Sequence, residues 1–184
     1  MTMDDIDVAL LIFRVVVGGT LVLHGLNHWR GGGRIAGTAS WFESLGLRPG
    51  RLHAWTSVLV EIGAGIAVAI GLFTPVACGA LIGVMVVAAV IEHRPHGFFV
   101  FRNGYEYVLM IAVICVGLSV SGPGEISADA ELGLPEWYGV AGSLIAVVIG
   151  VGGAVGLLAF AWRPDPPEPT PSSSSAGSAA GRAE

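Results

Sequence analysis

Charged residues interrupt three apolar stretches of the chain, and their types could perform acid–base chemistry. Arg14 lies inside "LLIFRVVVGG", Glu61 inside "LVEIGAGIAVAIG", and Glu106 at the start of "EYVLMIAVICVG". Because a charge at the centre of a bilayer costs about 2.5–3.5 kcal/mol on insertion scales, each of these side chains is expected to face protein rather than lipid. Carboxylates held in apolar surroundings can take up and release protons near neutral pH, so the pattern is typical of a buried polar site.

Further polar residues fall near the same end of the predicted bundle as the two glutamates. The candidate buried polar site comprises Arg14, His24, Glu61, Tyr105 and Glu106, with His28, His93 and His96 as accessory residues. Two interpretations stay open for this cluster: hydrogen bonding that holds the helices together, and a pocket for a small polar or quinone-like ligand. A metal or haem site is least favoured, because four-residue spacing suits His24 and His28 as ligands but nothing fixes the others. No metal ligand is therefore assigned.

The depth of the charges bears on how they pair. At 1.5 Å per helical residue, the backbones of Arg14 and Glu61 are about 10 Å apart along the membrane normal. Helical side chains lean toward the N-terminus, which works against a direct contact between these two. A direct ion pair and a water-linked chain are therefore equally favoured, and in both Arg14 turns inward onto acidic partners.

The elements that must position these side chains are membrane helices. The 184 residues are 53% hydrophobic and 12% charged, whereas a soluble domain has about 25% charged residues. Five apolar stretches, at about 6–26, 54–73, 76–92, 105–121 and 139–162, approach the roughly 20 residues that cross a bilayer. Thr74 and Pro75 are the expected break between the second and third. The predicted fold class is an all-α, polytopic membrane helical bundle over residues 1–162.

Two other segments have distinct patterns. Ile35, Ala39 and Phe42 recur at helical spacing, which predicts an amphipathic interfacial helix at about 34–46. Residues 163–184 are rich in Pro, Ser and Ala and are expected to form a disordered cytoplasmic tail. The two cysteines, Cys78 and Cys115, are too few and too far apart for a disulfide framework or a CxxC motif.

Arginine placement predicts the orientation, since the chain has no lysine. With five spans, eight of the nine arginines lie on one side of the membrane, in the first loop, the third loop and the tail. The charged residues on the other side are all acidic. The positive-inside rule then places the N-terminus outside and the C-terminus in the cytoplasm of a bacterial inner membrane. The net charge of −5 argues against nucleic acid as a partner.

The last apolar stretch carries small residues at every fourth position, which allow close helix contact. They are Gly142, Ala146, Gly150 and Ala154. Small-residue faces of this kind pack helices closely inside membranes. The favoured interpretation is packing within the bundle, and the alternative is a homo-oligomer interface.

Several of these segments together resemble the DoxX family of small bacterial membrane proteins. They are Arg14 in the first span, "HGLNHW", "GGGRIAGTASWFESLGLRPGRLHA", "LVEIGAGIAVAIGLFTP", "GFF", "GYE" and "GPGEISAD". The resemblance covers roughly residues 8–130. It implies a four-helix core, with the fifth helix and the tail outside it, and it singles out Arg14, Glu61 and Glu106 as polar motif positions. The family name comes from a subunit associated with a thiosulfate:quinone oxidoreductase, and relatives are linked to sulfur-compound and oxidative-stress metabolism.

The resemblance and the charged cluster predict an accessory subunit of a membrane redox system. Such a subunit would present a buried site to a quinone or a small thiol compound, as part of an oxidoreductase complex, or anchor soluble redox proteins at its cytoplasmic face. Whether the chain is itself catalytic stays open. The alternative is a non-enzymatic scaffold or assembly protein whose polar core only stabilises the bundle. A small-solute or proton carrier is least favoured, because the outer half offers few polar residues.

Overall fold

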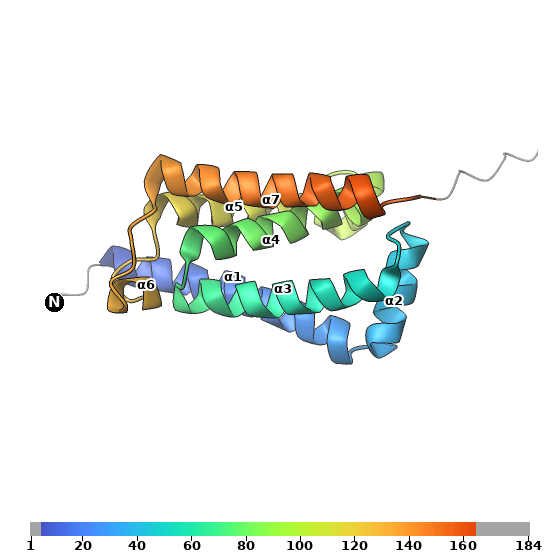
Figure 1. Cartoon of the computed structure of the whole chain (residues 1–184), viewed down its shortest axis with the longest axis horizontal. Coiled ribbons are helices and arrows are strands. Elements are labelled where there is room, and N and C mark those ends of the chain that lie inside the picture. The colour runs from blue at the N-terminus through green and yellow to red at the C-terminus, as the bar shows by residue number, and fades with distance from the viewer. Residues whose placement is uncertain (1–4, 165–184) are drawn as a thin grey trace, which may run out of the picture.

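A computed structural model describes residues 5–164 and consists almost entirely of helices (Figure 1). The helices are α1 (Asp5–Arg30), α2 (Arg34–Ser44), α3 (Gly50–Ile70), α4 (Thr74–Ala88), α5 (Glu106–Ser121), α6 (Ala128–Glu131) and α7 (Gly139–Ala161). A π-helical turn, Ala89–His93, and a 3₁₀ turn, Arg94–His96, extend α4, and a further 3₁₀ turn covers Val100–Arg102. The expected disordered tail beyond residue 164 lies outside the described residues.

Four helices have the length and apolar composition needed to cross a membrane. They are α1, α3, the extended α4 (Thr74–His96) and α7, whereas α5 is apolar but has only 16 residues. At 1.5 Å per residue α5 is about 24 Å long, somewhat less than the hydrocarbon core of about 30 Å. The predicted all-α, polytopic fold class is confirmed, and the crossing by α5 stays a prediction.

The hairpin between the second and third spans is not where the sequence placed it. The chain turns at residues 71–73, and α4 already begins at Thr74 with Pro75 in its first turn. A proline fits there because the first helical N–H groups have no intrahelical acceptor. Gly71 ends α3 with a φ of 70°, in the left-handed region that favours glycine.

The helices form two groups that lie side by side. The first is the antiparallel pair α1 and α3; in the second, α4 packs against both α5 and α7 (Figure 1). The α1–α3 contact depends on glycines, since a Cβ on Gly18 would collide with the carbonyl oxygen of Gly65. A core cluster that includes Leu21, Val68 and Leu81 joins the two groups.

The small-residue face of α7 packs inside the bundle. Gly142, Ala146, Gly150 and Ala154 are all buried. A Cβ on Gly150 would collide with Ile82 of α4, so the two helices meet closely at this point. The face is therefore covered by the chain's own helices, and the alternative of a homo-oligomer through these four residues is wrong.

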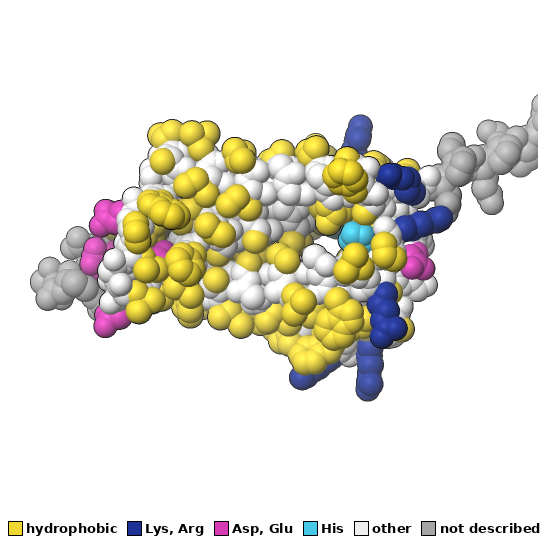
Figure 2. Space-filling model, viewed as in Figure 1, with side chains coloured by type: hydrophobic (Ala, Val, Ile, Leu, Met, Phe, Trp, Pro, Cys, Tyr) yellow, Lys and Arg dark blue, Asp and Glu magenta, His cyan; other side chains and the backbone are white. Residues whose placement is uncertain are grey.

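Charge is sorted to opposite ends of an apolar belt (Figure 2). We call the end that carries α2 and the C-terminus of α7 the arginine end, and the opposite end, which carries α6, the acidic end. At the arginine end the chain is tied across the bundle: Leu47 forms a β-bridge with Trp162, and the indole Nε1 of Trp162 donates to the carbonyl of Leu45. These bonds hold the end of α7 against the connection between α2 and α3.

Candidate ligand-binding groove

Arg14 is fully buried but does not meet either glutamate. Its Nη2 donates to the carbonyl of Ile126, in the segment that crosses the acidic end. Gly71 makes room for the guanidinium, because a Cβ there would collide with Arg14 Nη1. The Nε and Nη1 atoms have no hydrogen-bond partner among the described residues. The prediction that Arg14 turns onto Glu61 and Glu106 is therefore wrong.

Asp129 supplies the negative charge near Arg14. Its carboxylate acts electrostatically on the guanidinium and accepts hydrogen bonds from the backbone N–H groups of Phe73 and Thr74, at 2.7 and 3.1 Å, and from the Thr74 hydroxyl. The Tyr138 hydroxyl also donates to it, at 3.3 Å. Burial and the Asp129 charge raise the pKa of Tyr138 to about 12, so the phenol stays protonated as a donor. The acidic end is thus a structural polar network.

Glu61 lies in a separate polar group toward the arginine end. A Cβ on Gly25 would lie 3.1 Å from the Glu61 Cβ, and Gly25 is eleven residues from Arg14, or about 16 Å along α1. Glu61 Oε1 accepts a hydrogen bond from the Ser57 hydroxyl and lies 3.7 Å from His28 Nε2. The structure therefore brings together two of the predicted residues, Glu61 and His28.

The remaining predicted residues lie around this group or away from it. His24 is exposed and faces Tyr107, with 6.1 Å between ring centroids. Glu106 Oε2 accepts from the Val100 backbone N–H and so fixes the connection before α5. Tyr105 packs edge-on against Phe98. His96 is exposed and its Nδ1 contacts the carbonyl of Glu92, whereas His93, whose Nδ1 contacts the carbonyl of Asn103, reaches the cavity described next.

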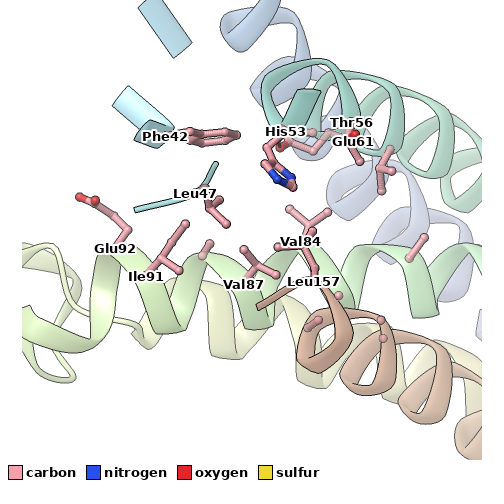
Figure 3. Close-up of a pocket in the computed structure, with 18 of the residues that line it drawn as sticks. Phe42, Leu47, His53, Thr56, Glu61, Val84, Val87, Ile91, Glu92 and Leu157 are labelled. Carbon is pink, nitrogen blue, oxygen red and sulfur yellow. Dashed lines mark hydrogen bonds between the residues drawn. The ribbon is translucent and has the colours of Figure 1, made fainter. Parts of the chain in front are cut away.

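A cavity of about 290 Å³ opens between α3 and α7, with α4 as its floor. Its apolar wall includes Val84 and Val87 of α4 and Leu157 of α7, and Phe42 and Leu47 close it at the arginine end (Figure 3). Figure 2 shows the surface hollowed on this side of the bundle, beside a visible histidine side chain. We call this cavity the lateral groove, because it opens through the side of the bundle.

Two buried polar atoms in the lateral groove have no partner among the described residues. They are Glu61 Oε2 and His53 Nε2, both on α3, and Figure 3 shows the His53 ring directed into the cavity. Buried polar groups are nearly always hydrogen-bonded, so two such atoms in one cavity are available to bind a ligand. An apolar cavity with a few convergent polar groups is the usual form of a small-molecule site.

His53 is the residue of this site that the sequence reasoning missed. It follows two arginines and precedes Trp55 near the predicted membrane surface, where a histidine is ordinarily solvated. The available signal was the spacing of His53, Ser57 and Glu61, which recur every four residues and therefore share one face of α3. Ser57 and Glu61 both contribute to the groove as this spacing requires.

The fold and its apolar belt define a multi-pass membrane protein. The DoxX family model matches residues 9–94, and this part of the chain belongs to the DoxX family. The match includes Arg14, His53 and Glu61 but ends before Glu106 and before α7. No curated protein and no solved structure was found to match the chain.

Replacing Arg14 with methionine is expected to lower the free energy of unfolding by about 2 kcal/mol. Methionine fills much of the space, but it leaves the Ile126 carbonyl without its donor and Asp129 without its nearby positive charge. The measurement is unfolding by sodium dodecyl sulfate in mixed micelles, with proteolysis of the 122–138 segment as a second readout. Arg14→Lys, which keeps the charge, should recover part of the loss, and an Arg14→Met protein as stable as the wild type would contradict the assigned role.

Proposed function

We propose that this DoxX-family protein binds a quinone-like molecule in the lateral groove, as an accessory subunit of a membrane redox system. The observation that carries the proposal is the pair of unpartnered atoms, Glu61 Oε2 and His53 Nε2, in an otherwise apolar cavity. A quinone carbonyl accepts a hydrogen bond from a protonated imidazole nitrogen, and a quinol hydroxyl donates to a carboxylate. The oxidised form of such a ligand can therefore bond to His53 Nε2, and the reduced form can bond to Glu61 Oε2.

The shape and position of the groove support a ligand from the bilayer. Its volume of about 290 Å³ is close to the lower limit of ordinary ligand cavities, about 300 Å³, and suits a single substituted ring. The opening lies between α3 and α7, so an apolar tail could remain in the lipid while the ring enters. Small residues on the α7 wall, Gly150, Gly153 and Ala154, leave the space that the ring would occupy.

The distribution of charge supports a place for this site in a larger system. We propose that the arginine end faces the cytoplasm of a bacterial inner membrane and that the N-terminus lies outside. Glu92 and His93 line the groove near that end, within reach of a soluble redox protein docked there. The alternative, a scaffold without a ligand, requires that the groove stay empty of quinone.

Substitution of Gly153 by leucine is expected to weaken quinone binding at least about tenfold, a loss of 1.4 kcal/mol in binding free energy. A Cβ at Gly153 meets no atom within 4 Å, so the new side chain occupies the groove without displacing a helix. The measurement is titration of decylubiquinone and a menaquinone analogue into the protein in nanodiscs. Quenching of tryptophan fluorescence reports binding, because Trp41 lines the groove.

Gly152→Leu is the matched control for this substitution. Gly152 also has open space around its Cβ position but does not line the groove, so its leucine variant should bind quinone within about twofold of the wild type. Saturable binding that only Gly153→Leu weakens would support the proposal. An absence of saturable binding by the wild-type protein, or equal binding by both variants, would refute it and favour the scaffold.

A further inference from the structure

The two oxygens of the Glu61 carboxyl group face different surroundings. Oε2 is buried with no hydrogen-bond partner among the described residues, and Glu61 lines the lateral groove. Oε1 accepts from Ser57 and lies 3.7 Å from His28 Nε2, on the side of α1. Glu61 is itself 3% exposed, and His28 is the basic side chain that approaches its carboxylate. The carboxyl group thus connects the cavity to α1.

His28 leads from this carboxyl group toward the arginine end. Its side chain is 18% exposed and it lies two residues before the end of α1. The ring stacks on Trp41 of α2, with 5.9 Å between centroids, and the Thr38 hydroxyl donates to the His28 carbonyl at 2.9 Å. These contacts hold the imidazole between a buried carboxyl group and water.

We propose that Glu61 and His28 form a proton relay between a quinol in the lateral groove and the water at the arginine end. This inference rests on the proposed function. In the first step the O–H bond of the quinol breaks, its electron pair stays on the quinol oxygen, and an O–H bond forms at Glu61 Oε2. Rotation of the carboxyl group then presents the protonated oxygen to His28 Nε2, which accepts the proton. The imidazolium releases that proton to water, and no electron moves in any of these steps.

Other titratable groups also surround the route. On α3 His53 lies in the groove, and at the end of α4 Glu92 and His93 line it. On α1 His28 itself lines the groove, and His24 acts electrostatically on His28. The groove-lining residues of α2 and α7 are not titratable. His53 is directed into the cavity and suits a contact with the ligand, whereas His28 borders the cavity and also lies 3.7 Å from Glu61 Oε1. The relay therefore assigns His28 a proton-exchange role in addition to its place in the groove lining.

Infrared difference spectroscopy of the protein in nanodiscs tests the relay. Decylubiquinol is kept at a saturating concentration, so that differences in quinol affinity between variants do not affect the spectra. Quinol binding should produce the C=O band of a protonated carboxyl group that Glu61→Gln abolishes, and transfer into ²H₂O should shift this band. His28→Phe should slow that shift by about a hundredfold, which is the lower range of general acid–base effects. His28→Gln, which keeps a polar side chain, should slow it equally.

His24→Phe is the matched control, because His24 lies one helical turn earlier on α1 and outside the groove. In the His24→Phe protein the C=O band of Glu61 should shift in ²H₂O at the wild-type rate. Tryptophan quenching on the same samples separates the two proposals. Quinol that binds without producing the Glu61 band, or a band that exchanges at the wild-type rate in both His28 variants, overturns the relay and leaves the binding site. Absence of quinol binding overturns both.

Discussion

Replacement of Asp129 by alanine is expected to lower the free energy of unfolding by about 4 kcal/mol. The side chain is 3% exposed and accepts hydrogen bonds from the Phe73 and Thr74 backbone, the Thr74 hydroxyl and the Tyr138 hydroxyl. Alanine leaves these donors buried without an acceptor, including the N–H groups at the start of α4. It also removes the negative charge near the buried guanidinium of Arg14.

Unfolding by sodium dodecyl sulfate in mixed micelles measures this loss. Asp129→Asn keeps one acceptor oxygen, that of the amide, and should lower the free energy of unfolding by about half as much. Glu131→Ala is the matched control, because Glu131 is exposed on the same short helix, α6. An ultraviolet titration should also show the pKa of Tyr138 falling in Asp129→Ala, since the carboxylate helps to raise it. Equal stability of the Asp129 and Glu131 variants would contradict the network.

Replacement of Gly18 by alanine is expected to destabilise the bundle by about 3 kcal/mol, the upper range of overpacking effects. The added Cβ would lie within 3 Å of the Ala69 backbone nitrogen and collide with the Gly65 carbonyl oxygen. Both are backbone atoms of α3, so no side chain can turn aside and the two helices must separate. The α1–α3 pair would then lose its close contact near the middle of α1.

The Gly19→Ala substitution, one residue later, is not expected to destabilise the bundle. A Cβ at Gly19 meets no atom within 4 Å, and alanine favours a helix over glycine by about 1 kcal/mol. The Gly19 variant should therefore equal or slightly exceed the wild type in resistance to heat and to detergent. A thermal shift assay compares the melting temperatures of the two variants. Equal melting temperatures of the Gly18 and Gly19 variants would show that the α1–α3 contact does not depend on glycine.

Fold class and helix positions were predictable because a bilayer imposes a strong requirement on sequence. A span needs about 20 apolar residues, and this requirement located α1, α3 and α7 to within a few residues. The helix boundaries were less accurate: α1 continues to Arg30, four residues past the expected end, because residues 26–30 contain no Gly or Pro and three glycines follow at 31–33. The turn at Gly71 depends on a left-handed backbone conformation that hydropathy does not report.

Contacts in the candidate site were predictable only where the two residues lie on one helix, or at a similar membrane depth on neighbouring helices. Glu61 and His28 met this condition. Arg14 did not, because its acceptor, Ile126, is 112 residues away in a segment without periodic hydropathy. The burial of Arg14 therefore followed from the cost of a charge in lipid, whereas the identity of its partner required the structure.

The DoxX match stops at residue 94, yet one wall of the lateral groove belongs to α7, some fifty residues later. A part of the chain that the family model matches and a part that it does not match thus share one cavity. Substitutions on α7 can widen, narrow or reshape the opening while Glu61 and the histidines of the matched part stay unchanged. The size of molecule that fits the groove is accordingly set by a helix that lies outside the family match.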